Sequence, residues 1–386
     1  CNEFKMKKIL IIHNKYRLTG GEDIAVENEV EFLKKRFQIK TLYFSNDITS
    51  YFYQLVWFIF NKNTKSNKIL SNAIEEYKPD YVYVHNTWFN ASLGVFDILE
   101  KRQIKTILKL HNFRYFCTRS YLTSNHLKEN IRCNACGLDS KSLGTINKYF
   151  QDSLLKSFLV NRYGKKYFNI LKNTKLKILV LTEFHKNFIT DLGIEESKVK
   201  VFPNFIEVNK EKVNKQKEDY IVYAGRISEE KGLKELISTF SKIDSKDVIL
   251  KIIGNGPLLN QLIEHNNSEI EFLGELPNKE VLKIIKNSKG VVTATKLLEG
   301  QPTLLCEASS MGIPSIFPRT GGLEEFFPNG YKYSYKQFDY KDLENKLSLL
   351  IDSIEIAPEG EQNRSFIEDY LSEEKLLGKF EKIINE

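Results

Sequence analysis

Long apolar runs are missing from this chain of 386 residues. The first apolar stretch, Ile9 to Ile12, is far shorter than the core of a secretory signal. No run approaches the roughly 18 apolar residues of a membrane-spanning helix. The chain also has no low-complexity tract and no internal repeat. We therefore expect a folded cytoplasmic protein, either free or associated with the inner face of the cytoplasmic membrane.

A dinucleotide-binding fingerprint is also absent. The turn after the first predicted strand reads HNKYRLTGGED and has no Gly-x-Gly-x-x-Gly, the pattern that lets a backbone approach a pyrophosphate in nicotinamide enzymes. This absence disfavours a dinucleotide oxidoreductase.

Cysteine is scarce, with five residues in the whole chain, and disulfides are not expected in a cytoplasmic protein. Cys117, Cys133 and Cys136 nevertheless fall in one long irregular stretch, 113–144, and Cys133-x-x-Cys136 has the spacing of metal ligands. Together with His126 or another side chain they could close a structural zinc site. Reduced thiols without a metal are the alternative, because the fourth ligand is not obvious.

The length and the charge distribution point to two halves. Domains usually hold about 100 to 200 residues, so two domains are expected. Residues 1–200 carry 33 Lys and Arg against 19 Asp and Glu, whereas the remaining residues carry 24 against 31. A basic first half suggests an anionic partner, such as phospholipid head groups, a lipid diphosphate or nucleic acid. A lysine-rich surface without a partner explains the same counts.

Short β-branched runs alternate with helical stretches along the whole chain, which is the pattern of parallel sheets covered by helices on both faces. A charged stretch poor in apolar residues, Glu207–Asp219, interrupts the alternation. The predicted fold class is α/β, with two Rossmann-like doubly wound domains facing a central cleft, where ligands of such folds bind. The predicted domains are residues 6–206, a linker at 207–219, residues 220–365, and a C-terminal helix within 366–386 that packs on either domain. The predicted strands are Ile9–His13, Thr41–Phe44, Tyr81–His85, Thr106–Leu110, Ile178–Leu181, Val199–Phe202, Tyr220–Ala224, Val248–Ile253, Ile270–Leu273, Val291–Thr293 and Ser315–Phe317.

Two carboxylates stand out in the second half. The stretch VVTATKLLEGQPTLLCEASSMGIP reads as a strand, a loop and a helix, with Glu299 in the loop and Glu307 on the helix. Pro302 suits the first turn of this helix, where its missing N–H would be unpaired in any case. We expect the free amides of Thr303 and Leu304 to point toward an anion.

Two cations precede this stretch. In YIVYAGRISEEKGLKEL, Arg226 follows a strand and Lys231 lies at the opening of a helix, which makes a diphosphate site on physical grounds. In IIGNGPLL, Gly254 and Gly256 form a tight turn that lets the backbone approach a ligand closely.

These segments together resemble the family 4 retaining glycosyltransferases of the GT-B fold, in particular enzymes of bacterial surface-polysaccharide synthesis. That family has a Gly-Arg, a Lys a few residues on, a Gly-x-Gly-Pro turn and two glutamates separated by seven residues. The resemblance runs from about Met6 to at least Asp352. Each motif alone is weak, but four in the same order and spacing are specific.

The resemblance implies a role for each matching residue. Arg226 and Lys231 would bind the donor diphosphate, Glu307 the ribose hydroxyls and Glu299 the transferred sugar. In the first domain, Gly20 and Gly21 match the family's glycine loop near the diphosphate, and His111 its sugar-contacting histidine. The family often has glycine where this chain has Pro302, so the donor sugar cannot be inferred.

The implied activity is transfer of a sugar, with retention, from a UDP- or GDP-linked donor to a glycan or to an acceptor on a polyprenyl diphosphate, in capsule, O-antigen or other surface-polysaccharide synthesis. No Asp-x-Asp motif is present, so catalysis is expected to need no metal ion. No nucleic-acid partner is implied. A nucleotide-sugar epimerase on the same fold and a non-catalytic subunit of a polysaccharide assembly complex remain alternatives.

An aromatic run, YFYQLVWFIFNK at residues 51–62, has two interpretations. It could dock on a membrane or clasp a lipid-linked acceptor, as aromatic and basic residues do at interfaces. A buried helix explains it equally well, since it is apolar nearly all round.

Overall fold

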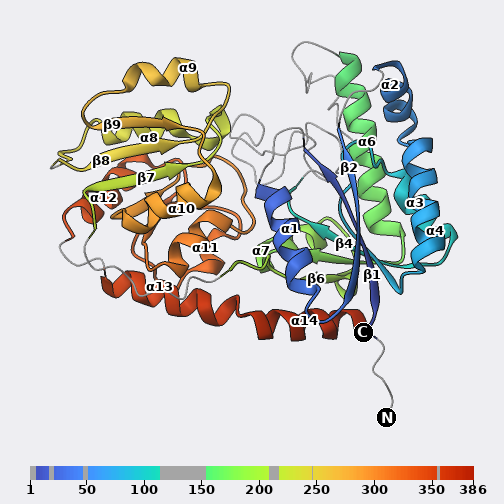
Figure 1. The fold of residues 1–386 in the computed structure, drawn as a ribbon. Helices are drawn as coiled ribbons and strands as arrows, with labels where there is room; N and C mark the ends of the chain where they lie inside the picture. The colour runs from blue at the N-terminus through green and yellow to red at the C-terminus, as the bar shows by residue number, and fades with distance from the viewer. Residues whose placement is uncertain are drawn as a thin grey trace. The chain divides into compact units, whose positions relative to one another are not determined.

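The computed structural model describes residues 6–16, 21–46, 51–113, 154–207, 217–245, 247–353 and 357–386. The chain divides into two compact units, one of residues 1–205 with 373–386 and one of residues 206–372 (Figure 1). Of the predicted linker, residues 208–216 lie outside the described part of the chain.

The first unit is a parallel six-stranded sheet in the order β2-β1-β3-β4-β5-β6. Its central strands are buried on both faces, as Ile9 to Ile12 show with no exposed surface, which is expected when helices cover a sheet from both sides. Its strands are β1 (Lys8–Lys15), β2 (Gln38–Ser45), β3 (Tyr81–Asn86), β4 (Lys105–Leu110), β5 (Leu176–Val180) and β6 (Val199–Val201). Its helices are α1 (Gly21–Leu33), α2 (Tyr51–Phe60), α3 (Thr64–Tyr77), α4 (Gly94–Lys101), α6 (Leu154–Asn173), α7 (Glu183–Asp191) and α14 (Glu373–Asn385), with the short 3-10 helix η1 (Glu196–Lys198).

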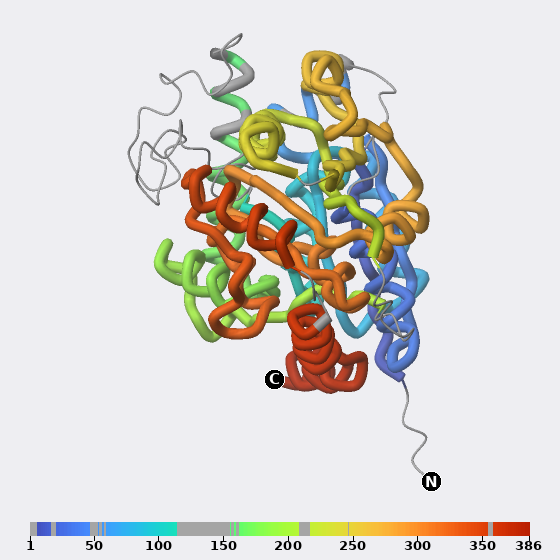
Figure 2. Tube along the Cα trace, turned by 90° about the vertical axis from the view of Figure 1, so that its left-hand side faces the viewer, coloured from blue at the N-terminus to red at the C-terminus, as the bar shows by residue number. Residues whose placement is uncertain are grey.

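The last helix, α14, belongs to the first unit although it ends the chain. The ring of Phe380 is fully buried and packs against the rings of Phe37, Tyr83 and Phe202. The Tyr81 hydroxyl donates to the Ile384 carbonyl at 2.6 Å. The Cα trace shows this helix in red beside the blue start of the chain (Figure 2).

The second unit is also a parallel six-stranded sheet, in the order β12-β11-β10-β7-β8-β9. Its strands are β7 (Tyr220–Ala224), β8 (Ile249–Ile253), β9 (Ile270–Gly274), β10 (Gly290–Val292), β11 (Ser315–Arg319) and β12 (Ser334–Lys336). Its α-helices are α8 (Leu233–Phe240), α9 (Leu259–Leu262), α10 (Asn278–Asn287), α11 (Thr303–Ser310), α12 (Tyr340–Ile351) and α13 (Ala357–Tyr370). Its 3-10 helices are η2 (Glu229–Lys231), η3 (Ile263–His265) and η4 (Leu323–Phe326).

The predicted fold class of parallel-sheet α/β domains is confirmed, and each predicted strand overlaps an observed one. Strand β12, at the edge of the second sheet, was not predicted. Among the helices that the structure describes, none is long and apolar enough to cross a membrane.

Candidate functional site

The loops after β7 and β8 in the second unit are held against each other at two glycines. A Cβ on Gly254 would lie 2.0 Å from the carbonyl oxygen of Gly225, and one on Gly256 would lie 2.2 Å from that of Ile227. Two backbone hydrogen bonds join the same loops, from the Gly225 amide to the Ile253 carbonyl at 3.0 Å and from the Ile227 amide to the Asn255 carbonyl at 2.9 Å. A side chain at either glycine would force these backbones apart, so the loop that carries Arg226 has a fixed place.

A third glycine brings Lys231 to the loop after β10. Gly232 has a φ of +69°, and a Cβ there would lie 1.9 Å from the Ala294 carbonyl oxygen. The loops are also joined by the Lys296 amide, which donates to the Glu230 carbonyl at 2.9 Å. This contact places the end of η2 beside the segment that contains Glu299.

Lys231 and Glu299 form an ion pair at this junction. The Lys231 Nζ lies 2.7 Å from Glu299 Oε1, with about a third of each side chain exposed. The Thr295 hydroxyl donates to the same oxygen at 2.9 Å. The structure therefore brings together one predicted cation and one predicted carboxylate, far apart in the sequence.

The backbone of Glu299 is fixed from the other side by the loop after β11. Gly321 has a φ of +58°, and a Cβ there would lie 2.1 Å from the Glu299 carbonyl oxygen, which accepts a hydrogen bond from the Gly322 amide at 2.9 Å. The Gln337 side chain donates to the carbonyls of Thr295 and Leu297, each at 3.2 Å. The sequence analysis missed Thr295, Gly321 and Gln337. The Gly321–Gly322 pair after a strand was the one available signal.

Arg226 is exposed, and its guanidinium forms no ion pair with any residue that the structure describes. Its backbone is held by the Tyr223 hydroxyl, which donates to the Arg226 carbonyl at 2.9 Å. Within the described residues, no side-chain hydrogen bond or ion pair joins Arg226 or Glu307 to the Lys231–Glu299 pair.

Glu307 lies on α11, as predicted, and is half-buried among apolar neighbours such as Leu305 and Cys306. Burial raises the pKa of its carboxyl to about 7, and a hydrogen bond with the Asn278 side chain opposes that rise. The group therefore titrates close to neutral pH.

The predicted amide site at the start of α11 needs a correction. The helix begins at Thr303, and Pro302 precedes it with φ −84° and ψ 79°, the angles of an inverse γ-turn. The Thr303 amide donates to the Gln301 carbonyl at 3.1 Å, so it is not free as expected. Pro302 is the central residue of this turn. The turn gives the first amide of the helix a hydrogen-bond partner, the Gln301 carbonyl, within the loop before it. Leu304 follows in the first turn of the helix.

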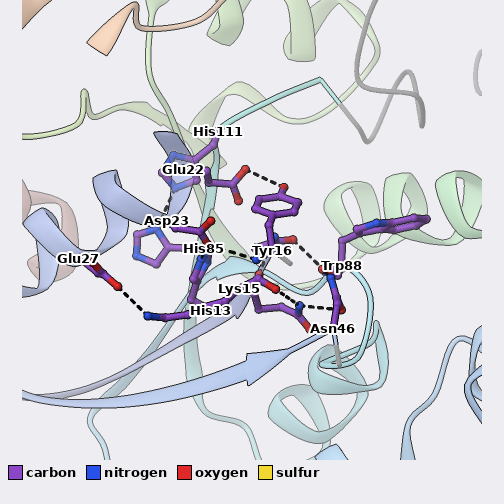
Figure 3. A network of polar contacts seen from close by, with 12 residues as sticks. His13, Lys15, Tyr16, Glu22, Asp23, Glu27, Asn46, His85, Trp88 and His111 are labelled. Carbon is purple, nitrogen blue, oxygen red and sulfur yellow. Dashed lines mark hydrogen bonds and ion pairs between the residues drawn. The ribbon is translucent and has the colours of Figure 1, made fainter. Parts of the chain in front are cut away.

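In the first unit, His111 follows β4 and lies beside His85 of β3 (Figure 3). The His85 Nδ1 is 2.9 Å from the His111 Nε2. Burial lowers the pKa of both imidazoles well below the usual value, and the charge of Lys109 adds to this effect in each case. Both rings are therefore neutral at physiological pH.

A buried ion pair is close enough to these histidines for its lysine to affect their pKa values. The Lys109 Nζ is 2.5 Å from Glu29 Oε2, and neither side chain has exposed surface. The Tyr83 hydroxyl donates to the other oxygen of Glu29 at 2.6 Å. Both carboxylate oxygens of Glu29 thus have partners, as a charge in an interior requires.

The predicted glycine loop lies only partly within the described residues. Gly20 lies outside them, and Gly21 begins α1 with no atom within 4 Å of a Cβ placed on it. The next two residues, Glu22 and Asp23, are acidic and lie in the first turn, where the helix dipole favours negative charge.

The predicted zinc ligands Cys117, Cys133 and Cys136 lie outside the described residues, as does His126. In the part of the chain that the structure describes, no group of three or more His, Cys, Asp or Glu side chains could hold a metal ion. Structural zinc therefore stays a prediction.

Comparison with solved structures defines the class of fold. Anabaena Alr3699/HepE, solved in complex with UDP and glucose, superposes with a TM-score of 0.67 over 99% of this chain and 100% of that one, at 13% sequence identity. At this identity the likeness concerns the fold alone. The two parallel-sheet α/β units are those of the GT-B glycosyltransferases.

Sequence comparison identifies the second unit more closely. Residues 205–368 match the family model "Glycosyl transferases group 1". CapM, the capsular polysaccharide biosynthesis glycosyltransferase of Staphylococcus aureus, is 29% identical over 231 residues, covering 56% of this chain and 60% of CapM. AmsD, the amylovoran biosynthesis glycosyltransferase of Erwinia amylovora, is 26% identical over 174 residues, covering 42% of this chain and 48% of AmsD. The matched segments thus span about three fifths of the length of CapM and about half of the length of AmsD.

Proposed function

We propose that this protein is a glycosyltransferase that moves a sugar from a nucleotide-sugar donor to a glycan or lipid-linked acceptor. The observation that carries the proposal is the Lys231–Glu299 pair, at 2.7 Å. It lies among the loops after β7, β10 and β11, which pack closely at Gly232 and Gly321, in the region that matches the Glycosyl transferases group 1 model. These loops follow strands of a parallel sheet, the edge at which ligands of such sheets bind.

The donor is a UDP- or GDP-linked sugar, in line with the UDP and glucose of the HepE complex. Arg226 and Lys231 bind its diphosphate. Glu307 binds its ribose hydroxyls, and Glu299 binds the transferred sugar. Gly254 and Gly256 let the backbone approach the donor closely. In the first unit, Gly20 and Gly21 approach the diphosphate and His111 contacts the sugar. At the start of α11, the backbone amide of Leu304 donates to the donor diphosphate. The amide of Thr303 does not, because it already donates to the Gln301 carbonyl.

The ion pair is compatible with diphosphate binding because an ammonium has three donors. One N–H of Lys231 donates to Glu299, and the other two remain for phosphate oxygens. Glu299 would therefore hold the lysine in place before the donor arrives, and Thr295 would hold Glu299.

In the proposed reaction the bond between the anomeric carbon and the diphosphate breaks, and Arg226 and Lys231 stabilise the charge that develops on the leaving group. An acceptor hydroxyl attacks from the same face, and a donor phosphate oxygen takes its proton, so the anomeric configuration is retained. Two cations in place of a metal ion agree with the lack of an Asp-x-Asp motif.

The acceptor is a glycan or a sugar on a polyprenyl diphosphate at the inner face of the cytoplasmic membrane, in capsule, O-antigen or similar surface-polysaccharide synthesis. The names of CapM and AmsD support this pathway. The predominance of basic residues in the first half of the chain supports an anionic membrane partner.

The test is transfer of labelled sugar from nucleotide-sugars chosen by thermal stabilisation with UDP, GDP and ADP. Replacement of Arg226 or Lys231 by Ala should lower kcat by about 10²- to 10³-fold, the usual effect of removing one charge-stabilising group. Glu307→Ala, which removes the contact with the ribose, should weaken donor binding and so lower transfer. Lys234→Ala, on the exposed side of α8, is the matched control and should keep normal turnover. Normal transfer by Arg226→Ala or Glu307→Ala would refute the assignment, and conversion of the donor without any acceptor would indicate an epimerase.

A further inference from the structure

The short helix η2, which carries Lys231, is contacted along its whole length by the loop after β10. The Lys296 side chain donates to Glu229 Oε1 at 3.0 Å. The Lys296 amide donates to the Glu230 carbonyl at 2.9 Å. The Glu299 carboxylate pairs with Lys231. Lys296 therefore holds the two residues that directly precede Lys231.

η2 needs such contacts to keep its place. It is a 3-10 helix of three residues, and a helix this short is marginal because its few hydrogen bonds must fix several dihedral angles. Gly232, which follows it, allows the close approach to the Ala294 carbonyl but supplies no side chain that would enforce it. The attraction between η2 and the loop after β10 thus comes from the hydrogen bonds and ion pairs of Lys296 and Glu299.

Lys296 is largely withdrawn from water between two carboxylates. Its side chain is 13% exposed, and its Nζ lies 2.7 Å from Glu235 Oε1, in the first turn of α8, as well as near Glu229. Burial opposes its charge, but hydrogen bonds with Glu235 and Glu229 outweigh this effect and raise the pKa of Lys296. The ammonium is therefore charged at physiological pH, and it ties η2 and α8 to the loop after β10.

We propose that Lys296 is a positioning residue for the donor diphosphate, because it fixes η2 so that the Lys231 ammonium faces the phosphates. Two of the three N–H groups of the Lys296 ammonium donate to carboxylates, so its effect on the diphosphate passes through Lys231. The inference rests on the proposed function, in which Lys231 binds the diphosphate.

The experiment measures how much the diphosphate adds to nucleotide binding, without any turnover. The full chain is titrated by calorimetry with UDP, GDP or ADP, whichever stabilises it most, and with the matching nucleoside by displacement of that diphosphate. The ratio of the two Kd values gives the contribution of the diphosphate. A general loss of folding would weaken both ligands, whereas a displaced Lys231 weakens only the diphosphate.

Lys296→Met keeps an unbranched side chain and removes the ammonium. The ratio should fall about tenfold, within the usual range when a group that orients a ligand-binding side chain is removed, and nucleoside affinity should not change. Lys296→Arg keeps the charge and the donors, so it should retain most of the ratio.

A double-mutant cycle with Lys231→Met separates positioning from direct contact. If Lys296 acts through Lys231, the double variant Lys231→Met/Lys296→Met should bind the diphosphate as Lys231→Met alone does. A direct contact of Lys296 with phosphate, or a general effect of its charge, would instead add its own loss.

Lys234→Met is the matched control. Lys234 lies 3.9 Å from the other oxygen of Glu229, too far for a hydrogen bond, and 39% of its side chain is exposed. The variant removes the same charge from beside the same carboxylate, and it should keep the ratio of the parent protein.

Glu229→Ala tests the same contact from the side of η2. With 62% of its side chain exposed, Glu229 can be replaced without disturbing the core. The variant should bind the diphosphate about threefold more weakly, the scale of an exposed ion pair. If Lys296 only cancelled negative charge near the phosphates, loss of this carboxylate would instead tighten binding.

Three results would overturn the inference: a folded Lys296→Met that keeps the ratio, additive losses in the double variant, and tighter diphosphate binding by Glu229→Ala. If Lys296→Met does not fold, Glu229→Ala decides. A ratio that Lys231→Met leaves unchanged would refute the proposed role of Lys231 itself. A loss in Lys231→Met without one in Lys296→Met would refute only the role of Lys296.

Discussion

At the scale of single residues, the site in the second unit depends on charges whose surroundings are set by distant parts of the chain. Glu299 accepts hydrogen bonds from Lys231 and Thr295, which reach it from two different segments. Glu307 is instead partly withdrawn from water on α11. The two carboxylates that look alike in the sequence therefore have different surroundings.

Glu307 should couple nucleotide affinity to pH. Its pKa is raised to about 7 in the folded protein, from 4.5 for an unperturbed side chain, by burial. As pH rises through 7, Glu307 loses its proton and its carboxylate can accept hydrogen bonds from two ribose hydroxyls. Nucleotide should therefore bind more tightly at pH 8 than at pH 6. Titration calorimetry with the stabilising nucleotide at both pH values measures this difference.

The raised pKa of Glu307 has the opposite effect on the stability of the fold, which falls as pH rises. The folded state holds the proton more tightly than the unfolded chain, so this group's stabilising contribution is complete below about pH 4.5 and is lost as pH rises through 7. Glu307→Gln should therefore have a higher Tm than the parent at pH 8 while binding nucleotide more weakly. A variant with lower Tm at pH 8, or a parent whose affinity does not change with pH, would contradict this account.

At the scale of elements, the site is made by loops that can approach only where a Cβ is missing. In the loops around Lys231 and Glu299, glycines face a backbone carbonyl oxygen at a distance that no side chain tolerates: Gly232, Gly254, Gly256 and Gly321. The loops carrying Arg226, Lys231 and Glu299 are therefore positioned by steric fit as well as by hydrogen bonds.

Gly232→Ala should destabilise the second unit more than Gly274→Ala. Both glycines have φ near +70°, but a Cβ at 232 would lie 1.9 Å from the Ala294 oxygen, whereas one at 274 has no atom within 4 Å. The left-handed backbone alone costs about 1–2 kcal/mol with a side chain, and the clash adds to that cost only at 232. Urea unfolding of both variants measures the difference, and equal losses of stability would show that the loop adapts freely.

The sequence predicts the sheets well because β-branched runs separated by helical stretches leave few other arrangements. It misses β12, since Ser334–Lys336 is short and has no apolar run of its own. It also misses the contacts of Gln337 and Gly321 with the Glu299 loop, because residues separated by tens of positions meet only in the fold. The Pro302 turn was placed in the helix rather than before it, since the sequence does not distinguish a proline in the first turn from one that forms an inverse γ-turn.

At the scale of the whole molecule, the end of the chain completes the core of its beginning. The buried face of α14 consists of Leu376, Leu377, Phe380, Ile383 and Ile384. Two of its acidic side chains pair with the first unit, Glu373 with Lys35 at 2.5 Å and Glu381 with Arg36 at 3.3 Å. These surface pairs add little, so the apolar face holds the helix.

Phe380→Ala should destabilise the first unit by about 3–5 kcal/mol, the usual cost of removing a buried aromatic side chain. Phe60→Ala is the control, because Phe60 lies in the same unit with 66% of its surface exposed. It should change the free energy of unfolding by less than about 0.5 kcal/mol. Equilibrium unfolding followed by tryptophan fluorescence measures both, since both tryptophans, Trp57 and Trp88, lie in the first unit. A tolerated Phe380→Ala would mean that α14 does not hold the core together.

The central claim is that Arg226 and Lys231 bind a pyrophosphate beside Glu299. A crystal structure of the protein with the nucleotide-sugar that stabilises it most tests this directly. We predict diphosphate oxygens within hydrogen-bond distance of the Arg226 guanidinium and the Lys231 ammonium, with the sugar at Glu299 and the ribose at Glu307. A diphosphate bound elsewhere, or one that leaves these four side chains without contact, would contradict the account.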